Sequence, residues 1–183
     1  KISVAVGDSK TRLKAITSEA DIYVTNRENI SWLLTNIKNA PKFDMIVLDE
    51  LSSFKNPRSQ RFTCLRKIKK PGTRMVGLTG TPCSNGLMDL FGEIGILDDG
   101  AHLGRYITHF RDKYYNHYNE WQYVLKDGAE EEIYKAIEPI TISMKATDYL
   151  DMPEKVVMID YVDMTSQEWK NYKYLRDNYI LPL

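Results

Sequence analysis

The sequence predicts an α/β fold in which a mostly parallel sheet is flanked by helices. Two observations support this prediction: short apolar runs alternate with longer helix-like stretches over residues 1–100, and two of those runs end abruptly in polar residues. Strands that alternate with helices are joined by right-handed crossovers and pair in parallel. A chain of 183 residues, 43% of them hydrophobic, is also long enough to bury a core.

Four strands are expected, each followed by a helix. The first strand precedes Gly7, and Asn29 is placed to cap the helix that follows the second strand. Pro41 and Pro71 mark the loops before the third and fourth strands. The expected strands cover residues 2–6, 22–25, 45–49 and 75–78, and the expected helices cover residues 10–16, 30–38, 59–68 and 87–96.

The stretch MIVLDELSSFKNP, residues 45–57, begins with a continuous apolar run and then turns acidic. Such a run is typical of a parallel strand that is buried on both faces. Asp49 and Glu50 follow at its carboxyl end, where open α/β sheets bind their ligands. An aspartate there can hold magnesium, and a glutamate beside it can orient or deprotonate water. Alone, the pattern also fits the start of a polar loop without chemistry.

The stretch VGLTGTP, residues 76–82, ends the fourth strand. Gly80 permits a tight turn, and Pro82 stops the strand. Thr79 and Thr81 place hydroxyls at the same sheet edge as the acidic pair, where they could relay the state of a nucleotide. Alone, this stretch would be a strand-to-helix turn with a threonine cap. Taken together, the two stretches indicate a nucleotide-hydrolysing motor domain.

DELSSFKNP followed by LTGTP resembles motifs II and III of superfamily II helicases, and most of all the Swi/Snf-type DNA translocases, including phage and bacterial members. The resemblance implies a RecA-like lobe of the P-loop NTPase type that uses ATP and magnesium. Asp49 would coordinate the magnesium and Glu50 would activate water. Thr79, Gly80 and Thr81 would couple hydrolysis to movement on DNA. Many relatives carry a histidine in place of Ser52, so a histidine-mediated coupling contact is not expected here.

The resemblance also implies a nucleic-acid surface. Thr25, Asn26 and Arg27 match the position of a nucleic-acid-contacting motif after the second strand, and Lys55 and Asn56 complete motif II. Hydrogen bonds from such residues to phosphates give affinity without sequence information. The implied partner is double-stranded DNA, because translocases of this family mostly track the duplex backbone. For Thr25 and Asn26, starting the next helix is an equally good interpretation.

The phosphate-binding loop G-x-x-x-x-G-K-[ST] is absent, because none of the ten glycines is followed by lysine. We therefore expect a fragment of a longer motor. Residues 1–100 would be the carboxyl-terminal part of the first RecA-like lobe, and residues 101–183 a helical insertion and connector toward a second lobe of the same parent chain. The isolated chain is expected to bind ATP and magnesium weakly or not at all, and to be inactive as an ATPase.

The character of the sequence changes after residue 100. Residues 104–123 are rich in aromatic side chains interleaved with arginine and lysine. They could stack unpaired bases, but a helical packing face is the favoured interpretation. By resemblance, residues 104–150 form an inter-lobe insertion or linker. Residues 166–179 are predicted to form an amphipathic helix with Trp169, Tyr172 and Leu175 on its apolar face.

Composition limits the possible functions. Lysine plus arginine and aspartate plus glutamate both number 25, so no overall charge attracts nucleic acid and any DNA site must be a local patch. No apolar run approaches the roughly 18 residues of a membrane span, and the isolated Cys64 and Cys83 fit a reduced, cytoplasmic protein. Two alternatives stay open: a non-enzymatic, motor-derived module that binds DNA or protein, and the motor subunit of a restriction system.

Overall fold

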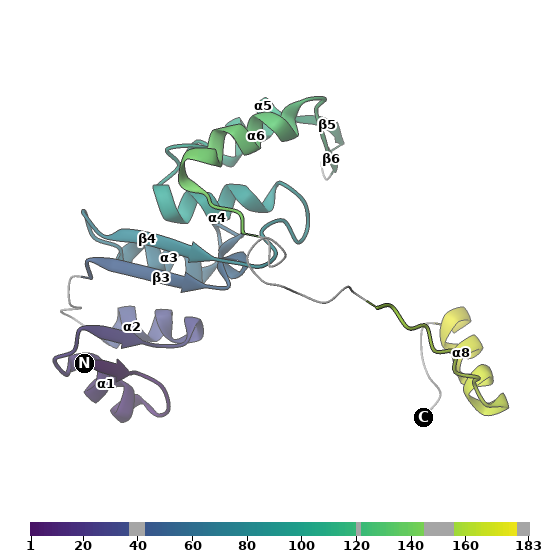
Figure 1. Ribbon diagram of the computed structural model, residues 1–183, viewed down its shortest axis with the longest axis horizontal. Coiled ribbons are helices and arrows are strands. Elements are labelled where there is room, and N and C mark those ends of the chain that lie inside the picture. Colours follow the sequence, from purple (N-terminus) through teal and green to yellow (C-terminus); the bar gives the residue numbers. More distant parts are fainter. Residues whose placement is uncertain (37–42, 120–121, 145–155, 179–183) are drawn as a thin grey trace. The chain divides into compact units, whose positions relative to one another are not determined.

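The computed structural model describes residues 1–36, 43–119, 122–144 and 156–178 (Figure 1). The chain forms two compact units, Lys1–Ile142 and Ser143–Leu183, and each is described by itself. Within these four ranges, no helix is long and apolar enough to cross a membrane.

The first unit begins with a small strand–helix–strand element. β1 (Ile2–Val4) and β2 (Ile22–Val24) pair in parallel, and α1 (Ser9–Thr17) connects them. Asp8 caps α1, because its Oδ1 accepts a 2.8 Å hydrogen bond from the Thr11 amide. The two strands and the helix lie where the sequence predicts them, with ends that differ by one or two residues.

The second parallel pair consists of β3 (Met45–Asp49) and β4 (Arg74–Leu78). The bounds of β3 are those predicted from the sequence, and β4 begins one residue earlier than predicted. Sheet hydrogen bonds in the described ranges join β1 to β2 and β3 to β4 as separate two-stranded pairs. The predicted α/β class with parallel strands is therefore confirmed, although the described strands do not form one continuous sheet.

The prediction that the third strand is buried on both faces is wrong for the described residues. Leu48 is buried and Ile46 packs against the same apolar cluster, whereas Met45 and Val47 are 50% and 55% exposed. The apolar residues of the neighbouring helices gather on the Leu48 side alone, and alternate side chains of a strand point to opposite faces. A continuous apolar run in the sequence does not show whether one face of the strand is covered by helices or both are.

Two helices cover the face of β3 and β4 on which Leu48 lies. They are α2 (Ile30–Asn36), which follows the short helix η1 (Arg27–Asn29), and α3 (Gln60–Ile68), which follows the short helix η2 (Leu51–Phe54). They share one buried cluster with the strands: Ile30, Leu48, Leu51, Phe54, Phe62, Leu65 and Ile96. The helix predicted at residues 59–68 is confirmed, and residues 37–38 of the one predicted at 30–38 lie outside the described ranges.

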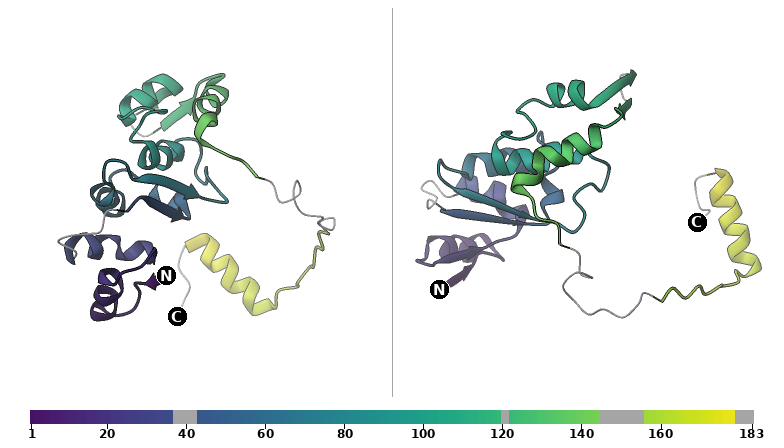
Figure 2. Two further views of the ribbon diagram at one scale, coloured as in Figure 1. Left: turned by 60° about the vertical axis from the view of Figure 1, so that its left-hand side comes forward. Right: turned by 45° about the horizontal axis from the view of Figure 1, so that its top comes forward.

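The helix α4 (Asp89–Asp98) joins two apolar clusters. Ile96 belongs to the cluster under β3, whereas Leu90, Phe91 and Ile94 belong to a second cluster built with the segments that follow. In Figure 1 and Figure 2, α4 accordingly lies between the β3–β4 pair and helices α5 and α6. The helix that follows LTGTP is thus central to the unit.

Residues 104–123 do not form the predicted helical face throughout. After α5 (Ile107–Tyr114) the chain continues into the antiparallel pair β5 (Tyr115–Asn119) and β6 (Gln122–Leu125), and α6 (Ala129–Ile137) and η3 (Glu138–Ile140) follow. The packing role is confirmed for part of the stretch. Phe110 and Tyr114 are buried in the second cluster, with Leu103, Ala129, Ile133 and Ile137.

The second unit contains the helix α8 (Ser166–Asn178), close to the predicted 166–179, of which residue 179 lies outside the described ranges. Thr165 and Glu168 form a capping box, in which Glu168 Oε2 accepts from the Thr165 amide at 2.7 Å. Trp169 and Tyr172 meet edge to face at 5.7 Å on the predicted apolar side, and both are 47% exposed.

Candidate active site

The register of β3 and β4 brings the two predicted motifs together. Asp49 lies opposite Leu78, so the residues that follow each strand emerge side by side at the carboxyl edge. The missing side chain at Gly77 of β4 makes room for Leu51, because a Cβ there would lie 2.6 Å from the Leu51 side chain. Leu51 therefore rests on the bare backbone of β4, which anchors the chain just after Glu50.

Glu50 has an unusual backbone conformation. Its φ of 56° and ψ of 63° lie in the left-handed region, which costs a non-glycine residue of the order of 1 kcal/mol and which is concentrated at functional sites. Its amide donates a 3.1 Å hydrogen bond to Asp49 Oδ1, and the Ser52 hydroxyl donates to Glu50 Oε1. Ser52 therefore contacts the predicted water-activating carboxylate directly.

The acidic pair suits a magnesium ion held largely by a nucleotide. Asp49 and Glu50 are both exposed at the strand edge, and the described residues include no cluster of three or more histidine, cysteine or acidic side chains that could cage a metal. Magnesium keeps several waters and is commonly bound through one or two carboxylates plus substrate phosphates. Asp49 fits that mode, since Oδ1 bonds the Glu50 amide and the carboxylate is otherwise open to solvent.

Thr79, Gly80 and Thr81 follow β4 at the same edge. The Thr81 amide donates a 3.2 Å hydrogen bond to the Thr79 hydroxyl, which forms a tight local turn. Gly80 and Thr81 are exposed, so this turn lies at the surface, following the strand that pairs with Asp49.

Lys55 connects the motif II segment to the segment after LTGTP. Its Nζ lies 3.1 Å from Asp89 Oδ2 on α4 and donates a 3.1 Å hydrogen bond to the Ser84 hydroxyl. Asp89 Oδ2 also accepts from the Asn85 amide at 3.1 Å. A charged hydrogen-bond network thus joins the end of the motif II segment to the segment after LTGTP. Asn56 acts locally, because its Oδ1 accepts a 2.9 Å bond from the Arg58 amide.

Close packing reinforces this connection. A Cβ at Gly92 of α4 would lie 2.0 Å from the Lys55 carbonyl oxygen, so glycine permits the helix to touch the motif II backbone. One residue later, Glu93 is 1% exposed, and neither of its carboxyl oxygens has a hydrogen-bond partner in the described part of the chain. Burial, then the nearby charge of Asp89, raises the pKa of Glu93 to about 7, although Lys55 acts in the opposite direction.

Comparison with known proteins assigns the chain to a family. A profile of the SNF2-related domain matches residues 3–181. The chain belongs to the SNF2-related domain family. The predicted resemblance to Swi/Snf-type helicases is therefore confirmed.

Relatives of this SNF2-related chain are longer proteins. It is 28% identical, over its full length and 42% of the relative, to putative protein p41 of Acyrthosiphon pisum secondary endosymbiont phage 1. It is 23% identical to the helicase-like transcription factor of Mus musculus, over 95% of this chain and 18% of that protein. The chain thus spans less than half the length of these relatives.

A solved structure supports the fold. The Sulfolobus solfataricus SWI2/SNF2 ATPase core in complex with dsDNA matches with a TM-score of 0.57 and 24% identity, over 75% of this chain and 27% of that one. This likeness confirms the RecA-like α/β class predicted for the SNF2-related chain.

The predicted nucleic-acid residues lie in two places. The Thr25 hydroxyl donates a 2.8 Å bond to the Ala5 carbonyl and accepts from Asn29 Nδ2 at 3.2 Å, so it joins β1 to the segment after β2. Asn26 is the N-cap residue of η1 but makes no side-chain cap. Arg27 is exposed and lines a pocket with Ser53 of the motif II segment. A role in nucleic-acid binding stays a prediction for each of these residues and for Lys55 and Asn56.

Several residues near the SNF2-related motifs were missed from the sequence. Asp89 and Glu93 carried no recognisable signal, since a partner 34 residues from Lys55 cannot be inferred from local spacing. Ser53 and Arg61 were treated as loop and helix residues, although both line the pocket with Arg27. The presence of three serines and three basic residues within residues 52–61 was the available hint.

Proposed function

We propose that this chain is part of an ATP-driven DNA translocase. Asp49 holds the magnesium that accompanies ATP, and Glu50 orients and deprotonates the attacking water. Bound magnesium supplies neutralisation of the charge on the transferring phosphates. Thr79, Gly80 and Thr81 couple hydrolysis to movement along DNA.

The observation that carries this proposal is the pairing of Asp49 with Leu78 across β3 and β4. Because of this pairing, the acidic pair and the Thr79–Gly80–Thr81 turn follow adjacent strands at one sheet edge. A nucleotide phosphate bound at that edge is therefore in reach of both. The Lys55–Asp89 ion pair of 3.1 Å then offers a direct path from the hydrolytic segment to α4.

Double-stranded DNA is the proposed partner. Support comes from the Sulfolobus solfataricus ATPase core, which was solved in complex with dsDNA. The chain has zero formal net charge, so binding would depend on a local cluster of cations rather than on overall attraction.

Hydrolysis requires parts beyond these residues. No glycine in the sequence is followed by lysine, so the loop that cradles phosphates in P-loop NTPases has no counterpart here. We propose that a second RecA-like lobe and a phosphate-binding loop of the parent protein complete the site, and that this chain alone does not turn over ATP.

A translocation assay on the parent protein tests the proposal. The protein should displace a third strand from a DNA triplex with ATP, but not with a non-hydrolysable analogue. Thr81→Val, which removes the exposed hydroxyl at nearly constant shape, should retain ATP hydrolysis while displacement slows. Failure of the wild-type protein to hydrolyse ATP or to displace the strand would refute the proposed motor and favour a non-enzymatic binding module.

A further inference from the structure

The carboxylate of Glu50 has one hydrogen-bond partner in the described part of the chain, the hydroxyl of Ser52. This hydroxyl donates to Glu50 Oε1 across only two residues. Glu50 is exposed and forms no ion pair within the described ranges, so its second oxygen, Oε2, has no partner there. The contact that holds the predicted water-activating carboxylate therefore comes from within the motif II segment itself.

The backbone after β3 brings these two side chains together. Glu50 adopts the left-handed conformation, with a φ of 56°, and the short helix η2 starts at the next residue. The Ser53 amide donates a 3.0 Å hydrogen bond to the Glu50 carbonyl, and the Lys55 amide donates a 3.4 Å bond to the Ser52 carbonyl. These bonds close a tight turn from Glu50 to Lys55, which keeps residues 50 and 52 close to each other.

Ser52 is held in place by its neighbours in η2. Leu51 before it and Phe54 after it are 5% and 1% exposed, and both belong to the cluster under β3. Leu51 also packs against Gly77 of β4. The Ser52 hydroxyl is thus a donor at a fixed place, although Ser52 itself is only half-buried.

A fixed donor matters to Glu50 because a glutamate side chain is flexible. An exposed glutamate samples several rotamers, and holding it in one of them costs conformational entropy. A hydrogen bond to an ionised carboxylate is among the stronger ones in proteins, so the Ser52 bond can favour one rotamer of Glu50 over the rest. A general base must lie within hydrogen-bond reach of the proton that it takes, so its rotamer affects the rate.

We propose that Ser52 is a positioning residue for Glu50: its hydrogen bond to Oε1 selects the rotamer in which Oε2 takes the proton of the attacking water. As that proton passes to Oε2, the water oxygen bonds to the terminal phosphorus of ATP, and the bond from this phosphorus to the oxygen of the departing ADP breaks. Ser52 keeps its own proton and acts only through Glu50. This inference rests on the proposed function, in which Glu50 is the base.

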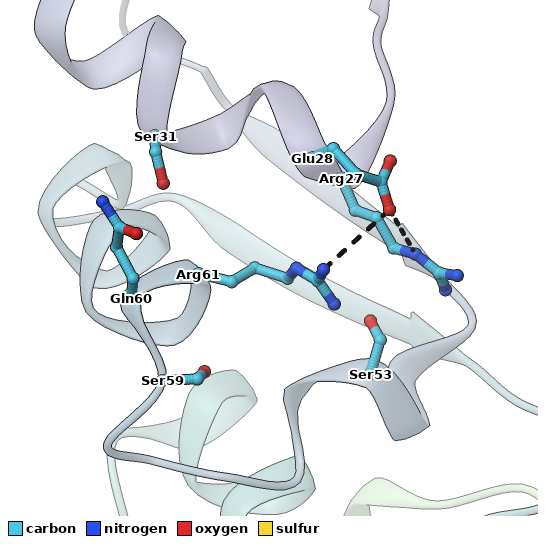
Figure 3. Close-up of a pocket in the computed structure, with 7 residues that line it drawn as sticks. All are labelled: Arg27, Glu28, Ser31, Ser53, Ser59, Gln60 and Arg61. Carbon is cyan, nitrogen blue, oxygen red and sulfur yellow. Dashed lines mark hydrogen bonds and ion pairs between the residues drawn. The ribbon is translucent and has the colours of Figure 1, made fainter.

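The adjacent serine offers a matched control. The Ser53 hydroxyl is buried without a hydrogen-bond partner among the described residues, and Figure 3 shows it directed toward Arg61, in a pocket that Arg27 also lines. Ser52→Ala and Ser53→Ala remove the same group from the same short helix. Only the first of them removes the hydrogen bond to the carboxylate of Glu50.

The test is ATP hydrolysis by the parent protein at saturating duplex DNA. Ser52→Ala should lower kcat about five- to tenfold and leave the KM for ATP unchanged, because the base is misplaced while the nucleotide contacts remain. Ser52→Thr retains a hydroxyl on the same carbon and should restore most of the lost kcat. Ser53→Ala should stay within about twofold of wild type.

A double variant separates positioning of the base from a general loosening of the motif II segment. In a Glu50→Gln background no base is left to position, so Ser52→Ala should not slow the residual hydrolysis further. Slowing by the same factor in both backgrounds would show a structural role and overturn the inference.

The proposed function and this inference fail in different ways. Loss of turnover in Glu50→Gln, together with wild-type or faster turnover in Ser52→Ala, would leave Glu50 as the base and refute the role of Ser52. Undiminished turnover in Glu50→Gln would count against both.

Discussion

Lys55 and Asp89, 34 residues apart, are joined by a 3.1 Å ion pair that links the end of motif II to α4. Asp89 is the more buried partner, with 14% of its side chain exposed against 31% for Lys55. Ser84 and the Asn85 amide also bond the same Asp89 oxygen, so the turn after LTGTP is held by the network. One hydrogen-bond network therefore connects the end of motif II, the turn after LTGTP and the start of α4.

Removing the charge of Lys55 should destabilise the folded chain. Lys55→Met keeps the aliphatic stem but leaves the largely buried Asp89 carboxylate without its cation, so we expect a loss of roughly 1–2 kcal/mol in the free energy of unfolding. Urea unfolding of the chain measures the loss. Lys67→Met, at an exposed position on α3, is the matched control and should change stability by less than about 0.5 kcal/mol.

The close contact between α4 and the motif II backbone predicts opposite effects at two glycines of one helix. Gly92→Ala would place a methyl group 2.0 Å from the Lys55 carbonyl oxygen, so the helix must shift, at a cost of about 1–3 kcal/mol. Gly95→Ala meets no atom within 4 Å and should stabilise by about 0.5–1 kcal/mol through helix propensity. Equal effects of the two substitutions in thermal unfolding would contradict the packing described here.

Glu93 predicts a pH dependence of stability. Its pKa is raised from the ordinary 4.5 to about 7, so the folded state binds the proton more tightly than the unfolded chain does. This contribution is fully present below pH 4.5 and is lost as pH rises from 4.5 through 7, by about 3 kcal/mol. Asp89 and Glu50 strengthen the effect, and Lys55 opposes it.

Glu93→Gln isolates that contribution, because glutamine does not ionise. The free energy of unfolding of wild type, measured in urea at pH 5 and pH 8, should fall more over this interval than that of the variant. The exposed Glu131→Gln serves as the control and should follow the wild-type dependence. Parallel curves for wild type and Glu93→Gln would show that the buried carboxyl does not titrate in this range.

The sequence predicted correctly those elements that a local pattern of residues determines. The apolar run followed by Asp49 predicted the limits of β3, and the parallel pairing lays the start of the Thr79 turn beside the acidic pair as expected. The aromatic residues of the stretch 104–123 predict a helical packing face, but aromatic side chains pack as well on strands as on helices. The pattern alone therefore did not show that strands begin after Tyr114. The pairing of Tyr115 with Leu125 and the stacking of His117 on Tyr123 depend on a partner strand that local propensity does not reveal.

The contacts around the site were less predictable for a similar reason. The Ser52–Glu50 bond spans two residues but depends on the left-handed conformation of Glu50, which the sequence does not signal because glutamate rarely adopts it. Glu93 could not be identified as buried, since a glutamate on a helix is usually exposed. These are tertiary effects that override residue preference.

The most direct test of the account is the rate of ATP hydrolysis by the parent protein, with and without duplex DNA, for wild type and Glu50→Gln. Glutamine retains the size and the Ser52 hydrogen bond but cannot take a proton from water. The account predicts DNA-stimulated hydrolysis in wild type, and its loss in the variant with ATP binding largely unchanged. Undiminished turnover in Glu50→Gln would contradict the assignment of Glu50 and, with it, the proposed site.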